Sequence, residues 1–222
     1  MRFALPVIAL AFSAAGPALA DESWPALFRD AVGPYQGEET LHSFDMSVTR
    51  GSGDVLFRYS YDPASSTPVT IHEQTDQISE ADLLESVSDD AGDIWCDGME
   101  DRVKGDVELA AESDTTATFT FTPTTPEDAE DFERQIAERS IGTVVVDKET
   151  RQLVSFQYHL PESFKPMIIA RVHTFDMFGT CEAGPSGRPY LSELTMAFDV
   201  SAMGQRQSES SIQRVENVEV AR

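Results

Sequence analysis

Four long β-strands in close succession dominate the second half of the chain and most constrain its fold. They are IGTVVVD (141–147), QLVSFQYHL (152–160), PMIIARVHTFDMFGT (166–180) and RPYLSELTMAFDV (188–200). β-Branched and aromatic residues are common in all four, and this composition is typical of paired strands. The block carries no nucleophile elbow, metal-ligand motif or phosphate loop. The block therefore favours a binding function over a catalytic one.

Residues 1–20 have the three parts of a secretory signal peptide. Arg2 gives a positive start, Phe3–Ser13 is mostly apolar, and Ala18-Leu19-Ala20 offers the small residues that signal peptidase reads. The apolar run is too short for a permanent membrane helix, which is the alternative. We expect cleavage near Ala20, a periplasmic or extracellular location, and a single domain over residues 21–222.

The chain is strongly acidic, with 39 Asp and Glu against 16 Lys and Arg and a net charge of −23. Nucleic acids and anionic lipid head groups are bound through Lys and Arg, so the overall charge disfavours both. We expect the charge to keep an exported protein in solution; attraction to a basic partner is the alternative. No nucleic-acid partner and no stable membrane insertion are expected.

The two cysteines, Cys96 and Cys181, are far apart in the sequence. An even count in an exported domain predicts one disulfide, which would hold the segment around Cys96 against the loop after the 166–180 strand. Closing so long a loop stabilises a fold by about 4–5 kcal/mol in the chain-entropy description. A catalytic or redox thiol is the alternative, but no C-x-x-C motif supports it.

The first half of the chain alternates between strands, turns and short helices. Hydrophobic periodicity predicts helices over 24–32, 79–88 and 125–139, and strands over 41–50, 54–62, 68–73, 106–111 and 115–122. With the later block, this gives about nine strands joined mostly by hairpins. The pattern is typical of an α+β fold: a strongly curved antiparallel sheet, or incomplete β-barrel, with helices packed on the concave face.

The predicted strand 166–180 is apolar on both faces. Met167, Ile169, Phe175 and Met177 fall on one face, and Ile168, Ala170, Val172 and Phe178 on the other. A strand of this kind is covered on both sides, or it lines a cavity. Sandwich packing and a cavity are equally compatible with the pattern.

No pattern of catalytic or metal-binding residues stands out, and we expect no cofactor, no metal site and no catalytic residue. The histidines, His42, His72, His159 and His173, are scattered, although His159 and His173 lie on adjacent predicted strands. The acidic segment 89–101 does not fit the EF-hand spacing. An enzyme that uses Asp147, Glu149 or Asp176 is the alternative, and it requires two carboxylates that converge in a pocket.

Two short motifs in the strand block resemble a known family. Val146-Asp147-Lys148-Glu149-Thr150 and Phe164-Lys165-Pro166, followed by Gly204, resemble the turns of the periplasmic outer-membrane lipoprotein carriers (the LolA/LolB-like superfamily), closest to exported proteobacterial members of unassigned function. The resemblance implies an incomplete antiparallel barrel whose hydrophobic inner face shields acyl chains. The chain lacks a match for the arginine with which carriers hold their closed state.

These observations predict a periplasmic binding or carrier protein that holds a lipid or other amphipathic ligand in a hydrophobic cup. The expected partner is a lipid, a lipid-modified ligand or an envelope protein. The alternative is a non-enzymatic envelope interaction or structural protein with a solidly packed sheet and no ligand. The bulky side chains expected to line the cup are Phe57, Tyr59, Phe119, Phe121, Phe156, Tyr158, Leu194, Met196 and Phe198.

Overall fold

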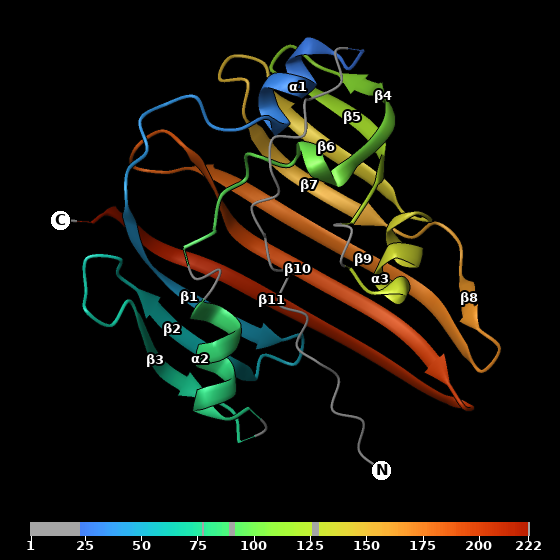
Figure 1. Cartoon of the computed structure of the whole chain (residues 1–222). Coiled ribbons are helices and arrows are strands. Elements are labelled where there is room, and N and C mark those ends of the chain that lie inside the picture. Colours follow the sequence, from blue (N-terminus) through green and yellow to red (C-terminus); the bar gives the residue numbers. More distant parts are fainter. Residues whose placement is uncertain (1–22, 77, 89–91, 126–128, 222) are drawn as a thin grey trace.

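The computed structural model describes residues 23–76, 78–88, 92–125 and 129–221. Over these residues the chain forms an eleven-stranded sheet, with every pair of neighbouring strands antiparallel, and three short α-helices (Figure 1). The predicted signal peptide, residues 1–20, lies outside the described residues. None of the helices in the described part of the chain is long and apolar enough to cross a membrane.

The strands are β1 (His42–Arg50), β2 (Val55–Tyr61), β3 (Val69–Gln74), β4 (Val103–Glu112), β5 (Thr116–Pro123), β6 (Ile141–Asp147), β7 (Leu153–His159), β8 (Phe164–Met167), β9 (Ala170–Ala183), β10 (Pro189–Ala202) and β11 (Gln205–Val220). The helices are α1 (Ala26–Val32), α2 (Glu80–Ser88) and α3 (Asp131–Ala137), and a 3₁₀ turn spans Glu100–Arg102.

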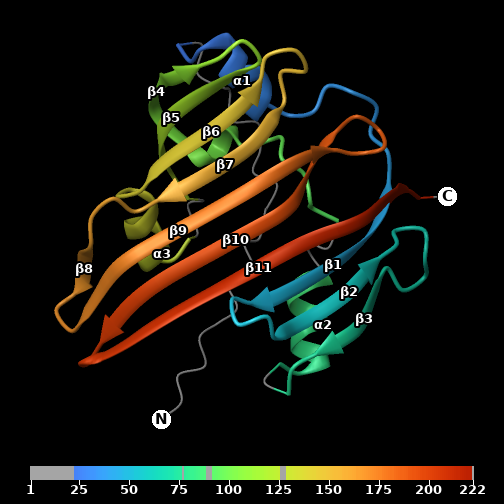
Figure 2. The same ribbon diagram turned by 180° about the vertical axis from the view of Figure 1, so that it is seen from behind.

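The sheet is open. Its strand order is β3-β2-β1-β11-β10-β9-β7-β6-β5-β4, with β8 paired to β9 beside this path. The first strand therefore pairs with the last, and the longest strands, β9 to β11, form the middle of the sheet (Figures 1 and 2). The antiparallel sheet that the sequence predicts is confirmed, and β3 and β4 are its two edges.

The helices lie on one side of the sheet, in front of it in Figure 1 and behind it in Figure 2. In α1, Phe28 is fully buried, and its ring lies 5.6 Å from that of Phe119 and 5.8 Å from that of Phe121 on β5. In α2, the Ser79 hydroxyl accepts a hydrogen bond from the Asp82 N–H at 3.1 Å, the predicted cap. One face of the sheet is thus buried under a helix at each end.

Two hydrophobic clusters occupy this helix side. The α1 cluster joins α1 to β5, β6, β7, β9 and the start of β10, and its buried members include Trp24, Phe28, Phe119, Phe121, Val144, Val146, Phe156 and Met177. The α2 cluster joins α2 to β1, β2, β3 and β11, and its buried members include Phe44, Met46, Phe57, Tyr59, Val69, Leu83 and Val215.

Two glycines on the helix side let aromatic rings lie flat across the strands. A Cβ at Gly142 would stand 2.5 Å from the Phe121 ring, and one at Gly179 would stand 2.4 Å from the Phe156 ring. Both distances are shorter than any real contact. Glycine is therefore required at these two positions for the rings to cover the neighbouring strand.

The prediction of a single continuous strand over 166–180 is wrong. The chain turns at Ile168 and Ile169, and β8 and β9 lie on either side of this turn. The β-branched residues suit a strand locally, but the pairing of Met167 with Ala170 places them in the turn. Strict alternation would put Val172 and Phe175 on opposite faces of the sheet. A register shift between them, in the pairing of β9 with β10, places both side chains on the same face.

Three further predictions need correction. The strand β11 was not expected, because both faces of its first half are polar, and the count is eleven rather than nine. The helix over 125–139 is shorter: α3 begins at Asp131, and no residue of it is buried. Its expected start at residues 126–128 lies outside the described residues. Cys181 lies within β9, not in the loop that follows.

Candidate ligand-binding face

All the side chains predicted to line a cup lie on the helix side of the sheet. The pairing shows this directly: Phe119 faces Val144, Val144 faces Phe156, Phe156 faces Gly179, and Gly179 faces Leu194. The neighbouring row runs from Tyr158 through Met177 to Met196, and Phe198 pairs with Phe175. On β2, Phe57 pairs with Val48, which pairs with Gln213 opposite Leu194.

These side chains differ in burial. Phe57 and Tyr59 are buried in the α2 cluster, and Phe119, Phe121 and Phe156 are buried in the α1 cluster. These five form the core under the helices. The remaining four, with Phe175 beside them on β9, are only half-buried, and we call this set the central patch: Tyr158, Phe175, Leu194, Met196 and Phe198. Its role in ligand binding stays a prediction.

The central patch lies between the two helix-covered ends of the sheet. Every residue of β10 from Ser192 to Ser201 is half-buried, in contrast to Leu191 before them, which is 5% exposed. In Figure 1, α1 lies over the upper end of the sheet and α2 over the lower left, with β10 and β11 passing between them. No described helix covers the middle of these two strands.

The Tyr158 hydroxyl is the distinctive polar group of the patch. It is buried, and it has no hydrogen-bond partner among the described residues. Burial raises the pKa of Tyr158 to about 12, so the hydroxyl stays neutral at physiological pH. The ring packs edge-on against Phe121, with centroids 6.2 Å apart. An unpaired buried hydroxyl costs about 1–3 kcal/mol, which a polar group bound beside it would recover.

Charged groups lie close to this hydroxyl, on the 3₁₀ turn before β4. Arg102 is 8% exposed, its Nε lies 3.6 Å from Asp101 Oδ1, and both charges act on Tyr158. Glu100 has one carboxylate oxygen buried without a partner among the described residues, and burial raises the pKa of this group. The patch therefore combines an apolar floor with a polar border at one side.

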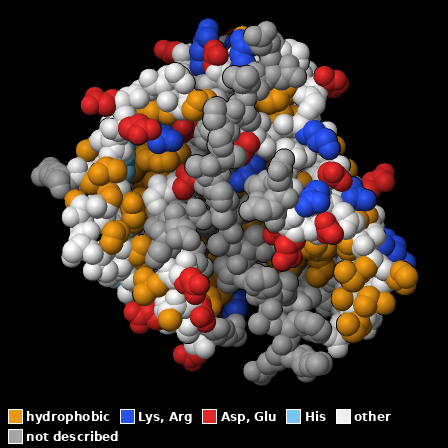
Figure 3. Space-filling view, in the orientation of Figure 1, with side chains coloured by type: hydrophobic (Ala, Val, Ile, Leu, Met, Phe, Trp, Pro, Cys, Tyr) orange, Lys and Arg blue, Asp and Glu red, His pale blue; other side chains and the backbone are white. Residues whose placement is uncertain are grey.

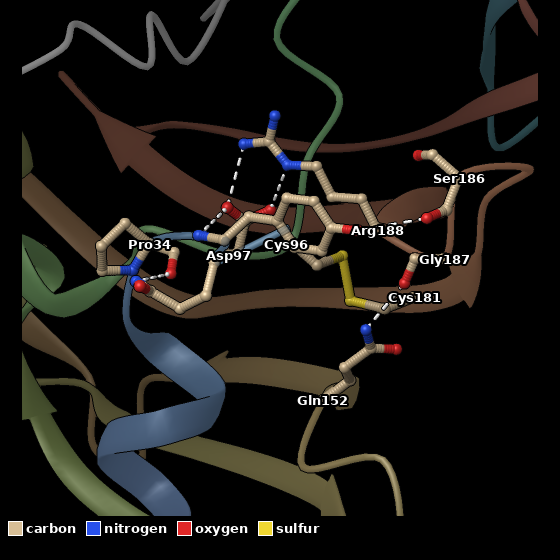
Figure 4. Close-up of polar contacts among 10 residues, drawn as sticks. Pro34, Cys96, Asp97, Gln152, Cys181, Ser186, Gly187 and Arg188 are labelled. Atoms are coloured by element: carbon tan, nitrogen blue, oxygen red, sulfur yellow. Dashed lines mark hydrogen bonds and ion pairs between the residues drawn. A yellow bond between two sulfur atoms is a disulfide. The ribbon is translucent and has the colours of Figure 1, made fainter. Parts of the chain in front are cut away.

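The predicted disulfide is present and anchors the upper end of the sheet. Cys96 and Cys181 are bonded, with Cα atoms 6.2 Å apart. Next to them, the Asp97 carboxylate accepts hydrogen bonds from Arg188 Nε at 2.7 Å, Arg188 Nη2 at 2.9 Å and the Tyr35 N–H at 2.9 Å (Figure 4). The Arg188 guanidinium also lies 4.4 Å from the Trp95 ring centroid.

Two more hydrogen bonds complete this corner. The Tyr35 hydroxyl donates to the Ser186 carbonyl at 3.1 Å, and the Gln152 amide donates to the Gly187 carbonyl at 2.7 Å. Figure 4 shows that these contacts converge on the β9–β10 turn from separate parts of the chain. We call this set the disulfide corner: Tyr35, Cys96, Asp97, Gln152, Cys181 and Arg188. Sequence reasoning found the disulfide but not the ion pair, because Asp97 reads as one of many acidic residues in the segment 89–101.

Asp147, His159 and His173 have separate local partners, whereas both ring nitrogens of the buried His42 have no hydrogen-bond partner among the described residues. Asp147 Oδ1 accepts hydrogen bonds from the Thr150 N–H at 2.8 Å and hydroxyl at 3.0 Å, and these lower the pKa of Asp147. The V-D-x-x-T motif is thus the turn between β6 and β7. His159 Nδ1 lies 2.5 Å from Asp176, whereas His173 contacts Ser201 at 2.9 Å. In the part of the chain that the structure describes, no three His, Cys, Asp or Glu residues are grouped to hold a metal.

Comparison with known proteins gives few matches. No family model matches the chain, and no curated protein matches it. One similar solved structure is the crystal structure of a DUF1329 family protein from Desulfovibrio piger: 13% identity, TM-score 0.33, 82% of this chain and 87% of that chain covered. Another is the MucA/MucB complex structure of Pseudomonas aeruginosa: 8% identity, TM-score 0.20, 88% and 96% covered. These values assign no family, so the resemblance to lipoprotein carriers stays a prediction.

Proposed function

We propose that the protein is a non-catalytic periplasmic carrier that holds a lipid or another amphipathic ligand against the central patch. The observation that carries this proposal is the change in burial along the helix side of the sheet. Both ends are packed under helices, while the aromatic, Leu and Met side chains between them stay half-buried. The disulfide between Cys96 and Cys181 fits an exported protein.

The ligand's chemistry follows from the groups of the patch. An acyl chain laid along Leu194, Met196 and Phe198 would gain about 0.8 kcal/mol for each methylene removed from water. The thioether of Met196 adapts to chains of different shape. A carbonyl or hydroxyl at the polar end of the ligand would pair with the Tyr158 hydroxyl. In this proposal the sheet is an incomplete barrel, with the helices on its concave face and the ligand between them.

A competing function is that of a structural or interaction protein with no ligand. The complete burial of Phe57, Tyr59, Phe119 and Phe121 in the two clusters favours it, because these side chains already have partners in the core. The two proposals differ in what fills the middle of the sheet. A carrier binds a lipid there in a saturable way, and a structural protein does not.

Titration with a fluorescent fatty acid tests the carrier proposal. We expect saturable binding to the wild type, and loss of it in Phe198→Asp, which places a charge in the central patch. Phe178→Asp is the matched control, because Phe178 is 44% exposed on the opposite face of the neighbouring strand. Binding that is absent from the wild type, or equal in both variants, contradicts the proposal.

Tyr158→Phe tests the polar end of the same ligand. It removes the hydroxyl and keeps the ring, so we expect about 2- to 12-fold weaker binding of the fatty acid, in line with one lost hydrogen bond. Folding should improve slightly, because an unpaired buried group disappears. Thermal unfolding of each variant shows whether a lost signal reflects the site or the fold.

A further inference from the structure

Two tight turns lie side by side at the end of the sheet opposite the disulfide corner. One joins β8 to β9 through Ile168 and Ile169, and the other joins β10 to β11 through Met203 and Gly204. The Met203 N–H donates a hydrogen bond to the Ile169 carbonyl at 2.9 Å, which ties the turns together. In Figure 1 they form the lower right end of the molecule, and in Figure 2 the lower left.

The side chains of these turns are apolar and exposed. We call Met167, Ile168, Ile169 and Met203 the apolar tip: each is more than half exposed, and Ile168 is 95% exposed. Figure 3 shows hydrophobic side chains gathered at this end of the molecule. A group of exposed apolar side chains, unlike a single one, marks a contact surface.

Local folding does not explain these residues. Two-residue hairpin turns favour Gly, Asn and Asp, which adopt the required backbone or bond to it. Met203 has a φ of 51°, in the left-handed region that favours glycine or asparagine, and Gly204 follows at 79°. Methionine at this position therefore weakens the turn. Isoleucine at both central positions of the other turn also runs against turn preference.

The residues nearest the apolar tip carry cations and no acid, and the first acids on either side along the chain are Glu162, Asp176, Asp199 and Glu209. Residues 163–171 and 200–208 include Lys165, Arg171 and Arg206 and no Asp or Glu, in a chain of net charge −23. Arg206 is paired with Asp199. Lys165 and Arg171 take part in none of the ion pairs found among the described residues, and Arg171 donates a hydrogen bond to the Ser163 hydroxyl at 2.7 Å. Two cations are thus free to meet an anionic surface.

We propose that the apolar tip docks the protein on an anionic lipid bilayer. The four apolar side chains enter the interfacial zone, and Lys165 and Arg171 contact the head-group phosphates. The overall negative charge is little obstacle, because β10 spans roughly 45 Å at about 3.3 Å per residue. The acids at its other end are several Debye lengths from the surface, at about 10 Å each in 0.1 M salt. This docking does not depend on the ligand proposed above.

Vesicle flotation tests the docking with protein recovered from the periplasm, after its N-terminus has been determined by mass. The probes are vesicles of phosphatidylcholine alone and of phosphatidylcholine with 30% phosphatidylglycerol. We expect binding to the anionic vesicles, at least tenfold weaker in the double variant Ile168→Ser, Ile169→Ser. Lys165→Gln with Arg171→Gln should weaken it about 20- to 30-fold, at roughly a factor of five for each cation.

One control and one further tip variant keep the test specific. Leu109→Ser removes an exposed apolar side chain from edge strand β4 and should leave vesicle binding unchanged. Met203→Asn suits the turn, so it should preserve thermal stability and still weaken vesicle binding. Wild-type protein that does not float with anionic vesicles overturns the proposal. An equal loss of vesicle binding in Leu109→Ser also overturns it. So does a dimer in solution that the tip variants dissociate, because the apolar tip would then bind a second copy of the chain. Failure here leaves fatty-acid binding to the central patch untouched, so the two proposals fail separately.

Discussion

β9 and β10 have opposite surroundings at their two ends. At the upper end, Cys181 and Arg188 are fixed by a disulfide and a buried ion pair. At the lower end, Ile168 and Met203 point into solvent from two-residue turns. The same pair of strands thus carries a rigid anchor and an exposed apolar end. The disulfide and the buried ion pair therefore lie at the end of β9 and β10 away from the apolar tip.

Removing the disulfide should have the largest effect on this contrast. The Cys96→Ser, Cys181→Ser double variant opens a loop with a sequence separation of 85 residues. We expect the free energy of unfolding to fall by about 4–5 kcal/mol, through loss of the constraint on the unfolded chain. Urea unfolding measures it. A loss under about 1 kcal/mol would show that the disulfide corner does not hold the sheet.

The ion pairs near the two ends of β10 provide a matched comparison. Asp97 has a side chain 7% exposed, and Asp97→Ala leaves Arg188 without its partner, so we expect a loss of about 3 kcal/mol. Asp199→Ala breaks the pair with Arg206, whose side chain is 65% exposed against 23% for Arg188, and we expect an effect at the limit of detection. Urea unfolding of both variants measures the two losses in the free energy of unfolding. Equal losses would contradict the contrast between the ends.

Glu100 tests whether the polar border of the central patch holds an unfavourable group. Burial raises the pKa of Glu100, so the folded state favours the protonated acid, and wild-type stability declines as pH rises through that pKa. Glu100→Gln should therefore be more stable than the wild type at pH 7, and the gap should close below about pH 4, where both are neutral. Thermal unfolding across pH measures the gap. A difference in stability that does not change with pH would show that ionisation of Glu100 is not its cause.

Met203→Asn should give a small gain in stability. Asparagine tolerates the left-handed backbone of Met203 better than methionine does, so we expect a gain of less than about 1 kcal/mol. Thermal unfolding measures it. A loss of stability would mean that Met203 contributes to the fold, and it would weaken the assignment of this turn to an external contact.

Much of the fold could be predicted from the sequence, because its strands alternate clearly. Phe119 and Phe121 on one face and threonines on the other locate β5, and the count of two cysteines gave the disulfide. The strand β11 was missed because residues 205–211 are polar on both faces. Its pairing with β10 on one side and β1 on the other, and not its own composition, makes it a strand.

The candidate site could be predicted only in part. Alternation correctly placed Leu194, Met196 and Phe198 on one face, but it could not show that Phe57 and Tyr59 belong to a separate cluster under α2. The predicted strand 166–180 runs through the turn at Ile168 and Ile169 because both residues are β-branched. Both errors have the same cause: local pattern gives the face of a side chain, while long-range packing decides whether that face is covered.

The most direct test of the account is a native mass spectrum of the protein after mild extraction from the periplasm. A carrier should show a population with one adduct of lipid mass in the wild type, and Met196→Asp, which charges the central patch, should lose that adduct. A bare mass for the wild type, or the same adduct in Met196→Asp, would contradict the proposal that the middle of the sheet holds a lipid.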